Sequence, residues 1–274
     1  MARFTTSDGL SLHFTDTGQG VPILCLAGLT RTGEDFAYVT PHLDGARVLT
    51  MDYRGRGRSD WAPDPSSYTP AREAQDVVEL LDHLGLPQVA ILGSSRGGLV
   101  AMVLAATAKD RLTGVALNDV GPELEPEGVA AISGYLGRDP DWRTLDEAAQ
   151  ARPAAMPGFR GVPEARWRQE VARLYRETPE GLRITYDPKL REAVLPDPPP
   201  PPVDLWPLFD ALEGLPLALI RGANSDLLSA ATAQKMQERR PDMILAEVAD
   251  RGHIPFLDEP EALAALRDWM GRLP

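Results

Sequence analysis

The fold is decided by residues 89–99, VAILGSSRGGL. Four apolar residues come first, as in a strand that is buried on both faces, and small and apolar residues follow. Between them, Gly93, Ser95 and Gly97 form the pattern G-x-S-x-G, in which a serine lies on a sharp turn between a strand and a helix. The segment therefore predicts an α/β fold in which Ser95 is a nucleophile exposed at the carboxyl edge of the sheet.

The residue types in this turn have physical reasons. Glycine at 93 and 97 leaves room for neighbouring backbone, and the helix that begins there offers unpaired N–H groups to an anion. Ser94 is the alternative nucleophile, but the glycine spacing selects Ser95. Because glycine and serine are common in loops, a purely structural turn is the other interpretation of a G-x-S-x-G pattern. The apolar strand and apolar helix on either side favour the catalytic one.

Short apolar runs, with amphipathic stretches between them, extend on both sides of this segment. The runs predict strands of a mostly parallel sheet at 21–27, 46–52, 88–94, 114–119 and 217–220, after an alternating strand near 10–14. Helices are predicted at 70–84, 97–108, 230–240 and 259–272. Alternation of strands and helices indicates a doubly wound α/β sheet.

The middle of the chain interrupts this alternation. Residues 122–203 contain no good strand run, and helix is clearest at 163–177. Aromatic residues are frequent there, and the proline run 196–202 should form a stiff extended strap. We therefore expect an α/β core made of residues 1–121 and 204–274, with residues 122–203 inserted as a helical cap.

A serine nucleophile needs a base, and His253 is the best placed of the four histidines. It lies in residues 250–260, DRGHIPFLDEP, after the last predicted strand and before the last helix. Such a loop lies at the carboxyl edge of the sheet, where sites of open α/β folds form. His13, His42 and His83 fall in a strand, a loop and a helix, where packed or surface roles are expected.

Two aspartates could orient this histidine. Asp226 follows a predicted strand and gives the chain order Ser95, Asp226, His253 that this architecture uses. Asp119 ends another predicted strand and is the competitor, with a loop-capping carboxylate as its alternative role. We predict Asp226 as the catalytic acid.

Composition excludes several classes of function. The 274 residues include 28 Lys and Arg against 40 Asp and Glu, and the formal net charge of −12 argues against nucleic-acid binding and against docking on an anionic membrane. Cys25 is the only cysteine, so neither an intrachain disulfide nor a cysteine metal cluster is expected. No apolar run fits a signal peptide or a spanning helix, and we expect a cytoplasmic protein.

The chain resembles the α/β-hydrolases, and within them the esterase, lactonase and perhydrolase group. The resemblance covers essentially the whole sequence. Besides the serine turn, it rests on LAGL at 26–29, DYRGRGRS at 52–59, GANSD at 222–226 and GHIPFL at 252–257. These motifs are specific for the fold and the triad, but they do not specify the substrate. Residues 122–203 stand where this family carries its helical cap.

The resemblance also implies an oxyanion hole made of the backbone N–H groups of Leu29 and Arg96. The family often has His-Gly before the first donor, where this chain has Ala27, but the hole should survive because the donor is backbone. The cationic side chain of Arg96 is unusual at that position. We expect it to pair with a carboxylate such as Asp52 or Asp119, and contact with an acidic substrate is the alternative.

The sequence thus predicts a serine hydrolase that cleaves a carboxylic ester or lactone through an acyl-enzyme on Ser95, with no metal and no organic cofactor. Two alternatives stay open: a cofactor-free perhydrolase or haloperoxidase, and a small-molecule receptor of the same fold with slow turnover. Trp142 and Trp167 are candidates to line the substrate cavity beneath the cap. The expected partner is a small ester or lactone, not nucleic acid or membrane, and assembly into a homo-oligomer is left open.

Overall fold

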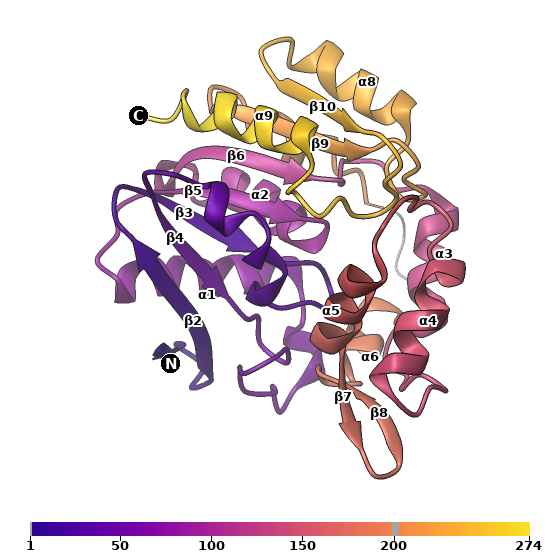
Figure 1. Cartoon of the computed structure of the whole chain (residues 1–274). Coiled ribbons are helices and arrows are strands. Elements are labelled where there is room, and N and C mark those ends of the chain that lie inside the picture. The colour runs from indigo at the N-terminus through magenta and orange to yellow at the C-terminus, as the bar shows by residue number, and fades with distance from the viewer. Residues whose placement is uncertain (1, 199–202) are drawn as a thin grey trace.

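The computed structural model describes residues 2–198 and 203–274, and an eight-stranded sheet forms its centre (Figure 1). Its strands are β1 (Ala2–Thr5), β2 (Ser11–Gly18), β3 (Val21–Leu26), β4 (Ala46–Met51), β5 (Val89–Ser94), β6 (Leu112–Asn118), β9 (Leu217–Gly222) and β10 (Ile244–Val248). They lie in the order β1-β2-β4-β3-β5-β6-β9-β10. The pairs β1/β2 and β2/β4 are antiparallel, and every other neighbouring pair is parallel. The predicted α/β class with a mostly parallel sheet is confirmed.

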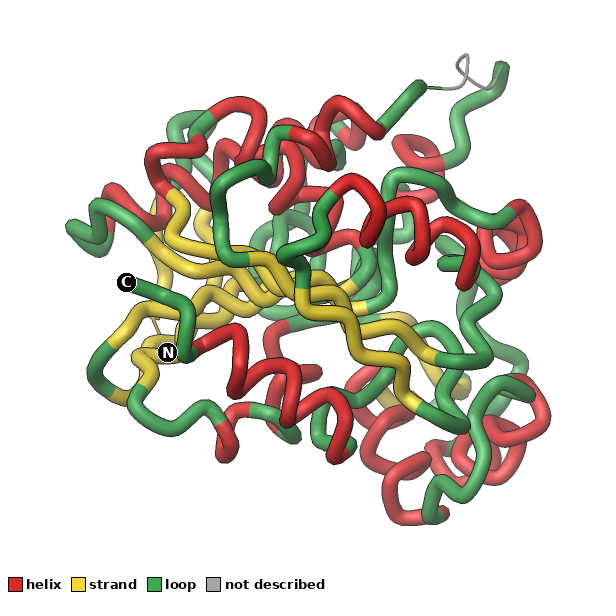
Figure 2. The backbone as a smooth tube through the Cα atoms, turned by 90° about the horizontal axis from the view of Figure 1, so that it is seen from above, coloured by secondary structure: helices red, strands yellow, loops and turns green. Residues whose placement is uncertain are grey.

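Helices cover both faces of this sheet, as Figure 2 shows on either side of the yellow strands. The α-helices outside residues 122–203 are α1 (Pro70–His83), α2 (Arg96–Thr107), α7 (Trp206–Asp210), α8 (Ala230–Arg239) and α9 (Pro260–Met270). Short 3₁₀ turns are η1 (Gly33–Ala37), η2 (Thr40–His42), η3 (Pro65–Ser67) and η4 (Lys109–Arg111). Within the described parts of the chain, none of the helices has the length and apolar character needed to span a bilayer.

The core consists of buried apolar side chains on the two faces. One cluster joins the sheet to α1, α2 and α8 and includes Ile91, Val100 and Leu117. The cluster on the other face joins the sheet to η1 and α9 and includes Trp269. Cys25 belongs to this second cluster and is fully buried, and burial raises the pKa of its thiol. This packing on both faces fixes the central strands that carry the site.

Helix α1 shows how local sequence positions charged groups beside the site. Thr69 caps the helix by accepting a hydrogen bond from the Arg72 N–H, and Pro70 fills the first turn, where a missing N–H does no harm. Its buried face carries Glu73 and Asp76 among apolar residues. Both carboxylates are fully buried, so each needs a cationic partner.

Residues 122–203, as far as they are described, contribute no strand to the main sheet. They form α3 (Pro126–Tyr135), α4 (Leu145–Ala155), α5 (Glu164–Leu174), α6 (Leu190–Val194) and a hairpin of β7 (Tyr175–Thr178) and β8 (Gly181–Ile184). Figure 1 shows this group gathered at one side of the sheet. The exact limits 122 and 203 stay a prediction.

For this segment the sequence predicts no strand and a proline strap at its end. The absence of strands is wrong, because the helix predicted over 163–177 ends at Leu174 and the chain turns back after Thr178 to pair β7 with β8. Gly181 has a φ of +127°, which only glycine adopts easily, and it allows the return at the start of β8. Strands of four residues are too short to give a clear period of two. The predicted proline strap falls largely on residues 199–202, which lie outside the described residues.

Candidate active site

Ser95 lies on the turn between β5 and α2 with φ +50° and ψ −111°, a strained conformation for a residue with a side chain. The neighbouring glycines make the turn feasible. A Cβ on Gly93 would lie 2.6 Å from the carbonyl carbon of Gly97, and a Cβ on Gly97 would lie 2.0 Å from the carbonyl oxygen of Leu26. Steric exclusion therefore requires glycine at both positions, and the turn holds the Ser95 hydroxyl clear of the sheet.

Ser94 has a different environment. It is the last residue of β5 and is buried, and its Oγ accepts a hydrogen bond of 3.0 Å from the Asn118 side-chain amide. Ser95 instead lines a cavity. The structure thus separates the two serines as the glycine spacing predicts.

His253 bridges Ser95 and a carboxylate. It lies in the loop between β10 and α9, and its Nε2 is 2.9 Å from the Ser95 Oγ. Its Nδ1 is 2.7 Å from Oδ2 of Asp119, a fully buried residue. When the Nδ1–H donates to this carboxylate, Nε2 is left to accept the serine proton, which is the tautomer that a general base needs.

The structure corrects the sequence prediction of the acid. Asp119, and not Asp226, contacts His253. The Asp119 carboxylate is also held by the Gly222 N–H at 2.8 Å and by the Ser225 hydroxyl at 2.6 Å. The exposed Asp226 lies at the cavity wall, four residues beyond the end of β9. The loop after β9 thus donates hydrogen bonds to the carboxylate that contacts His253 and does not supply that carboxylate.

The two predicted oxyanion donors are the backbone N–H groups of Leu29 and Arg96. Arg96 follows Ser95 directly, and Leu29 lines the same cavity. Gly28 also approaches Ser95, because a Cβ placed on this glycine would lie 3.9 Å from the serine Cβ. In residues 2–198 and 203–274, no acceptor satisfies the backbone N–H of Leu29 or of Arg96. Both groups are therefore available to a bound anion, and their role in catalysis stays a prediction.

The Arg96 side chain turns away from the cavity towards α1. Its Nε donates to the Glu73 carboxylate at 2.7 Å and its Nη2 to the Tyr68 carbonyl at 3.1 Å, so the expected partners Asp52 and Asp119 are wrong. Burial alone would raise the pKa of Glu73, but the charges of Arg96 and Arg56 outweigh it and lower that pKa. Glu73 is thus a buried anion that fixes Arg96, the residue of one predicted oxyanion donor, and it is not among the residues predicted from the sequence.

The cavity above Ser95 has a volume of about 710 Å³ and is lined both by residues of the main α/β fold and by residues of the segment 122–203, the predicted cap. Trp142 and Trp167, the two predicted cap residues, both line it. Trp167 is buried and packs edge-on against Phe159, with ring centroids 5.7 Å apart. Trp142 packs in the same way against Tyr175 at 6.3 Å. The tryptophans are therefore placed to meet a ligand, and direct contact with substrate stays a prediction.

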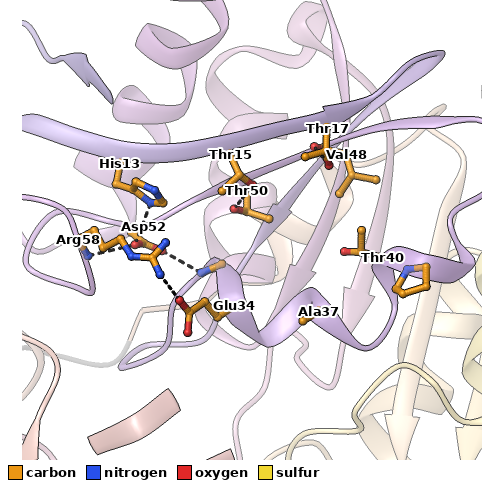
Figure 3. Close-up of a pocket in the computed structure, with 12 residues that line it drawn as sticks. His13, Thr15, Thr17, Glu34, Ala37, Thr40, Val48, Thr50, Asp52 and Arg58 are labelled. Atoms are coloured by element: carbon orange, nitrogen blue, oxygen red, sulfur yellow. Dashed lines mark hydrogen bonds and ion pairs between the residues drawn. The ribbon is translucent and has the colours of Figure 1, made fainter. Parts of the chain in front are cut away.

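A second, smaller hollow of about 340 Å³ is lined by neither Ser95 nor His253 (Figure 3). Asp52 lies at one end of it. Its carboxylate accepts the Gly33 N–H at 2.9 Å and the Arg58 N–H at 3.1 Å, and it lies 3.2 Å from Nδ1 of His13. The Gly33 and Arg58 N–H groups and the buried His13 ring all contact this carboxylate. We therefore interpret Asp52 as a structural residue that holds these three parts of the chain together. Nowhere in the described residues are three or more His, Cys, Asp or Glu arranged to hold a metal ion.

The chain is similar to a known protein family, to a characterised relative and to several solved structures. The model of a family described as the alpha/beta hydrolase family matches residues 23–266. A 3-hydroxybutyrate-oligomer hydrolase from Cupriavidus necator is 36% identical, over 88% of this chain and 85% of its own. The crystal structure of an alpha/beta hydrolase from Novosphingobium aromaticivorans is 40% identical, with a TM-score of 0.91 over 99% of this chain and 98% of that one. An esterase from Thermogutta terrifontis is 25% identical, with a TM-score of 0.74 over 99% and 98% of the two chains.

Proposed function

The chain belongs to the alpha/beta hydrolase family, and we propose that it hydrolyses carboxylic esters through an acyl-enzyme on Ser95. The observation that carries the proposal is the continuous hydrogen-bond path from Asp119 through His253 to the Ser95 hydroxyl, with lengths of 2.7 and 2.9 Å. Nucleophile, base and orienting acid at these distances form the arrangement used for acyl transfer. The N–H groups of Leu29, in the wall of the same cavity, and of Arg96, the residue after Ser95, support the proposal as candidate oxyanion donors.

Each group has a defined part in this mechanism. The Ser95 Oγ attacks the acyl carbon while Nε2 of His253 takes the hydroxyl proton, and Asp119 stabilises the resulting imidazolium. The N–H groups of Leu29 and Arg96 stabilise the negative oxygen of the tetrahedral intermediate, with about 3–4 kcal/mol for each donor in comparable sites. His253 then gives its proton to the leaving alcohol and activates a water molecule that releases the acid.

The choice of substrate class draws on the cavity and on one relative. A volume of about 710 Å³ accommodates a small or medium ester, and aromatic rings line it. The relative from Cupriavidus necator is named for hydrolysis of 3-hydroxybutyrate oligomers, which are linear esters of a hydroxy acid. We therefore propose short linear esters, including oligoesters of hydroxy acids, ahead of lactones.

The test combines turnover with active-site labelling. A panel of 4-nitrophenyl esters and hydroxy-acid dimers is assayed with wild type, Ser95→Ala and Ser94→Ala. We expect Ser95→Ala to keep its circular dichroism spectrum and to lose turnover by about 10⁴-fold or more. A fluorophosphonate should label Ser95 in wild type and also in Ser94→Ala, as peptide mass spectrometry would show.

Four outcomes would contradict the proposal. Labelling on Ser94, or full activity of Ser95→Ala, would remove the nucleophile assigned here. Labelling of Ser95 with no turnover of any ester would favour the slow-turnover receptor. Peracid formation from acetate and peroxide that exceeds ester hydrolysis would favour the perhydrolase.

A further inference from the structure

Arg152 is a cation in the wall of the cavity that the mechanism does not use. It lies in α4 one turn after Ala148 and Ala149, so it extends the buried face of that helix. Its Nε is shielded from solvent and has no hydrogen-bond partner. Across residues 2–198 and 203–274, no carboxylate oxygen lies within 4 Å of its guanidinium. An unpaired buried polar group is costly and needs an explanation.

The neighbouring arginines are already matched. Arg31, in the same cavity wall, pairs with Asp35 and Glu170 at 2.5 Å each. Arg173 pairs with Glu170 at 3.3 Å. This cluster, as described, therefore sets three arginines against two carboxylates, and Arg152 is the one left over. Burial lowers the pKa of Arg152, but an arginine stays protonated in a protein, so the excess positive charge remains.

We propose that Arg152 binds a carboxylate carried by the substrate, which makes esters bearing a free carboxylate the preferred substrate class. This inference rests on the ester-hydrolase function proposed above. A guanidinium offers a planar fork of donors that fits a carboxylate in two parallel hydrogen bonds. Because the cavity also contains Ser95, a carboxylate held at Arg152 would orient the ester at the nucleophile through binding remote from the reacting bond.

The experiment compares pairs of esters in which a carboxylate of the acidic ester replaces a methyl group of the neutral one. One pair is mono-4-nitrophenyl glutarate against 4-nitrophenyl pentanoate, with equal acyl length and the charge on the acyl side. The other pair is the acetyl ester of 3-hydroxybutanoate against sec-butyl acetate, with the charge on the alcohol side. Hydrolysis of this pair is measured by titration of the acid that is released. The measured quantity is the ratio of kcat/KM for the acidic ester to that for the neutral one.

The variants are Arg152→Leu, Arg152→Gln and Arg152→Lys, with Arg143→Leu as the matched control. Arg143 is an exposed arginine just before α4 that does not line the cavity. In at least one pair, we expect Arg152→Leu and Arg152→Gln to lower the ratio by about 10–100-fold, mainly through KM of the acidic ester. Arg152→Lys should recover part of the ratio, and Arg143→Leu should match wild type.

Kinetic and binding results can each contradict the proposal. If kcat/KM falls by the same factor for both esters of each pair in the Arg152 variants, or if the ratio of the two values does not change, the arginine is a packing or stacking group only. Calorimetric titration of Ser95→Ala with glutarate, and with the neutral glutaramide, separates this proposal from the proposed function. Binding of glutarate alone that disappears in Ser95→Ala/Arg152→Leu supports the anion site even if no ester is turned over. Equal binding of glutarate with and without Arg152 overturns it.

Discussion

Asp119→Asn should depress the hydrolysis of every ester by about the same factor. Asp119 accepts hydrogen bonds from His253, from Gly222 and from Ser225, so an amide at this position would hold the wrong imidazole tautomer in nearly unchanged geometry. We expect a fall in kcat of about 10⁴-fold, the scale of the same change in a serine protease. Steady-state kinetics on an ester panel measures it.

Asp226→Asn is the control for this prediction. Asp226 is exposed, so its amide variant should keep at least a third of the activity on neutral esters. A uniform loss in Asp226→Asn, together with normal activity of Asp119→Asn, would show that the hydrogen bonds of Asp119 are structural and that the acid lies elsewhere.

The sequence predicts the serine and the histidine of this site but not the acid, and the reason is physical. Asp119 and Asp226 both follow strands that end at the same sheet edge, and both give the chain order Ser, Asp, His. The choice depends on tertiary structure. Asp119 is the first residue after β6 and adopts a φ of +57°, and the loop after β9 donates hydrogen bonds to it. Its position directly at a strand end was the one signal in the sequence that favoured it.

Glu73 illustrates a signal of a different kind. The helical period of α1 places it on the buried face with Ala74 and Val77, where a carboxylate must find a cation. This position is the signal in the sequence from which a cationic partner of Glu73 could be inferred. The sequence does not identify Arg56 and Arg96 as the partners, because both are distant from Glu73 along the chain and only the fold brings them together.

At the scale of elements, the cap tryptophans should differ in what they do. Trp142 is only partly buried, so Trp142→Ala should change relative rates among esters of graded acyl length by about 10–100-fold with little loss of stability. Trp167 is buried in the cluster of Ala148, Val171 and Leu182, so Trp167→Ala should also cost about 3–5 kcal/mol of stability. That loss corresponds to a fall in Tm of roughly 10 °C.

Kinetics on 4-nitrophenyl acetate to octanoate, with melting curves for each variant, measures both effects. Fluorophosphonate labelling of Ser95 should persist in the two variants, because the triad is not touched. If neither variant alters the relative rates, the rings only pack the cap.

Most elements could be predicted because their patterns are long and locally consistent. The strand predicted near 10–14 continues to Gly18 as β2, and the other predicted strands and helices of the core agree with the structure within two residues at either end, as for β3 and α8. The hairpin β7–β8 could not be predicted, because four-residue strands give no clear alternation and follow a helix without a break. β1 was missed for a similar reason, since its four residues bury only Phe4.

At the scale of the whole molecule, α5 ties the cap to the core. Glu170 pairs with Arg31, and Arg166 pairs with Asp258 in the loop before α9. The Arg166 guanidinium also lies 3.6 Å from the centroid of the Tyr38 ring. Since Trp167 lies between these anchors, the ion pairs fix both the position of the cap and one wall of the cavity above Ser95. The stability of this connection should therefore depend on pH.

Asp258→Asn tests that dependence. Burial alone would raise the pKa of Asp258, but the hydrogen bonds and charge of Arg166 outweigh it and hold that pKa below its ordinary value. The pair therefore stabilises the fold fully above the unfolded-state pKa of about 3.9, and this contribution is lost as the pH falls through the lower folded-state pKa. For a partly exposed pair we expect about 0.5–1 kcal/mol, so wild type should melt about 1–3 °C above Asp258→Asn.

The difference in Tm should stay constant from pH 8 to pH 5 and then shrink below pH 4, because protonation removes the same ion pair from wild type that the substitution removes from the variant. The control is Asp268→Asn, which breaks an exposed pair between Asp268 of α9 and Arg272, two residues beyond the end of that helix, and this pair joins no separate parts of the fold. Scanning calorimetry at several pH values measures the two differences. A Tm difference that grows as the pH falls from 6 to 4, or one that Asp268→Asn reproduces in size and pH course, would mean that the bridge between α5 and the α9 loop does not hold the cap in place.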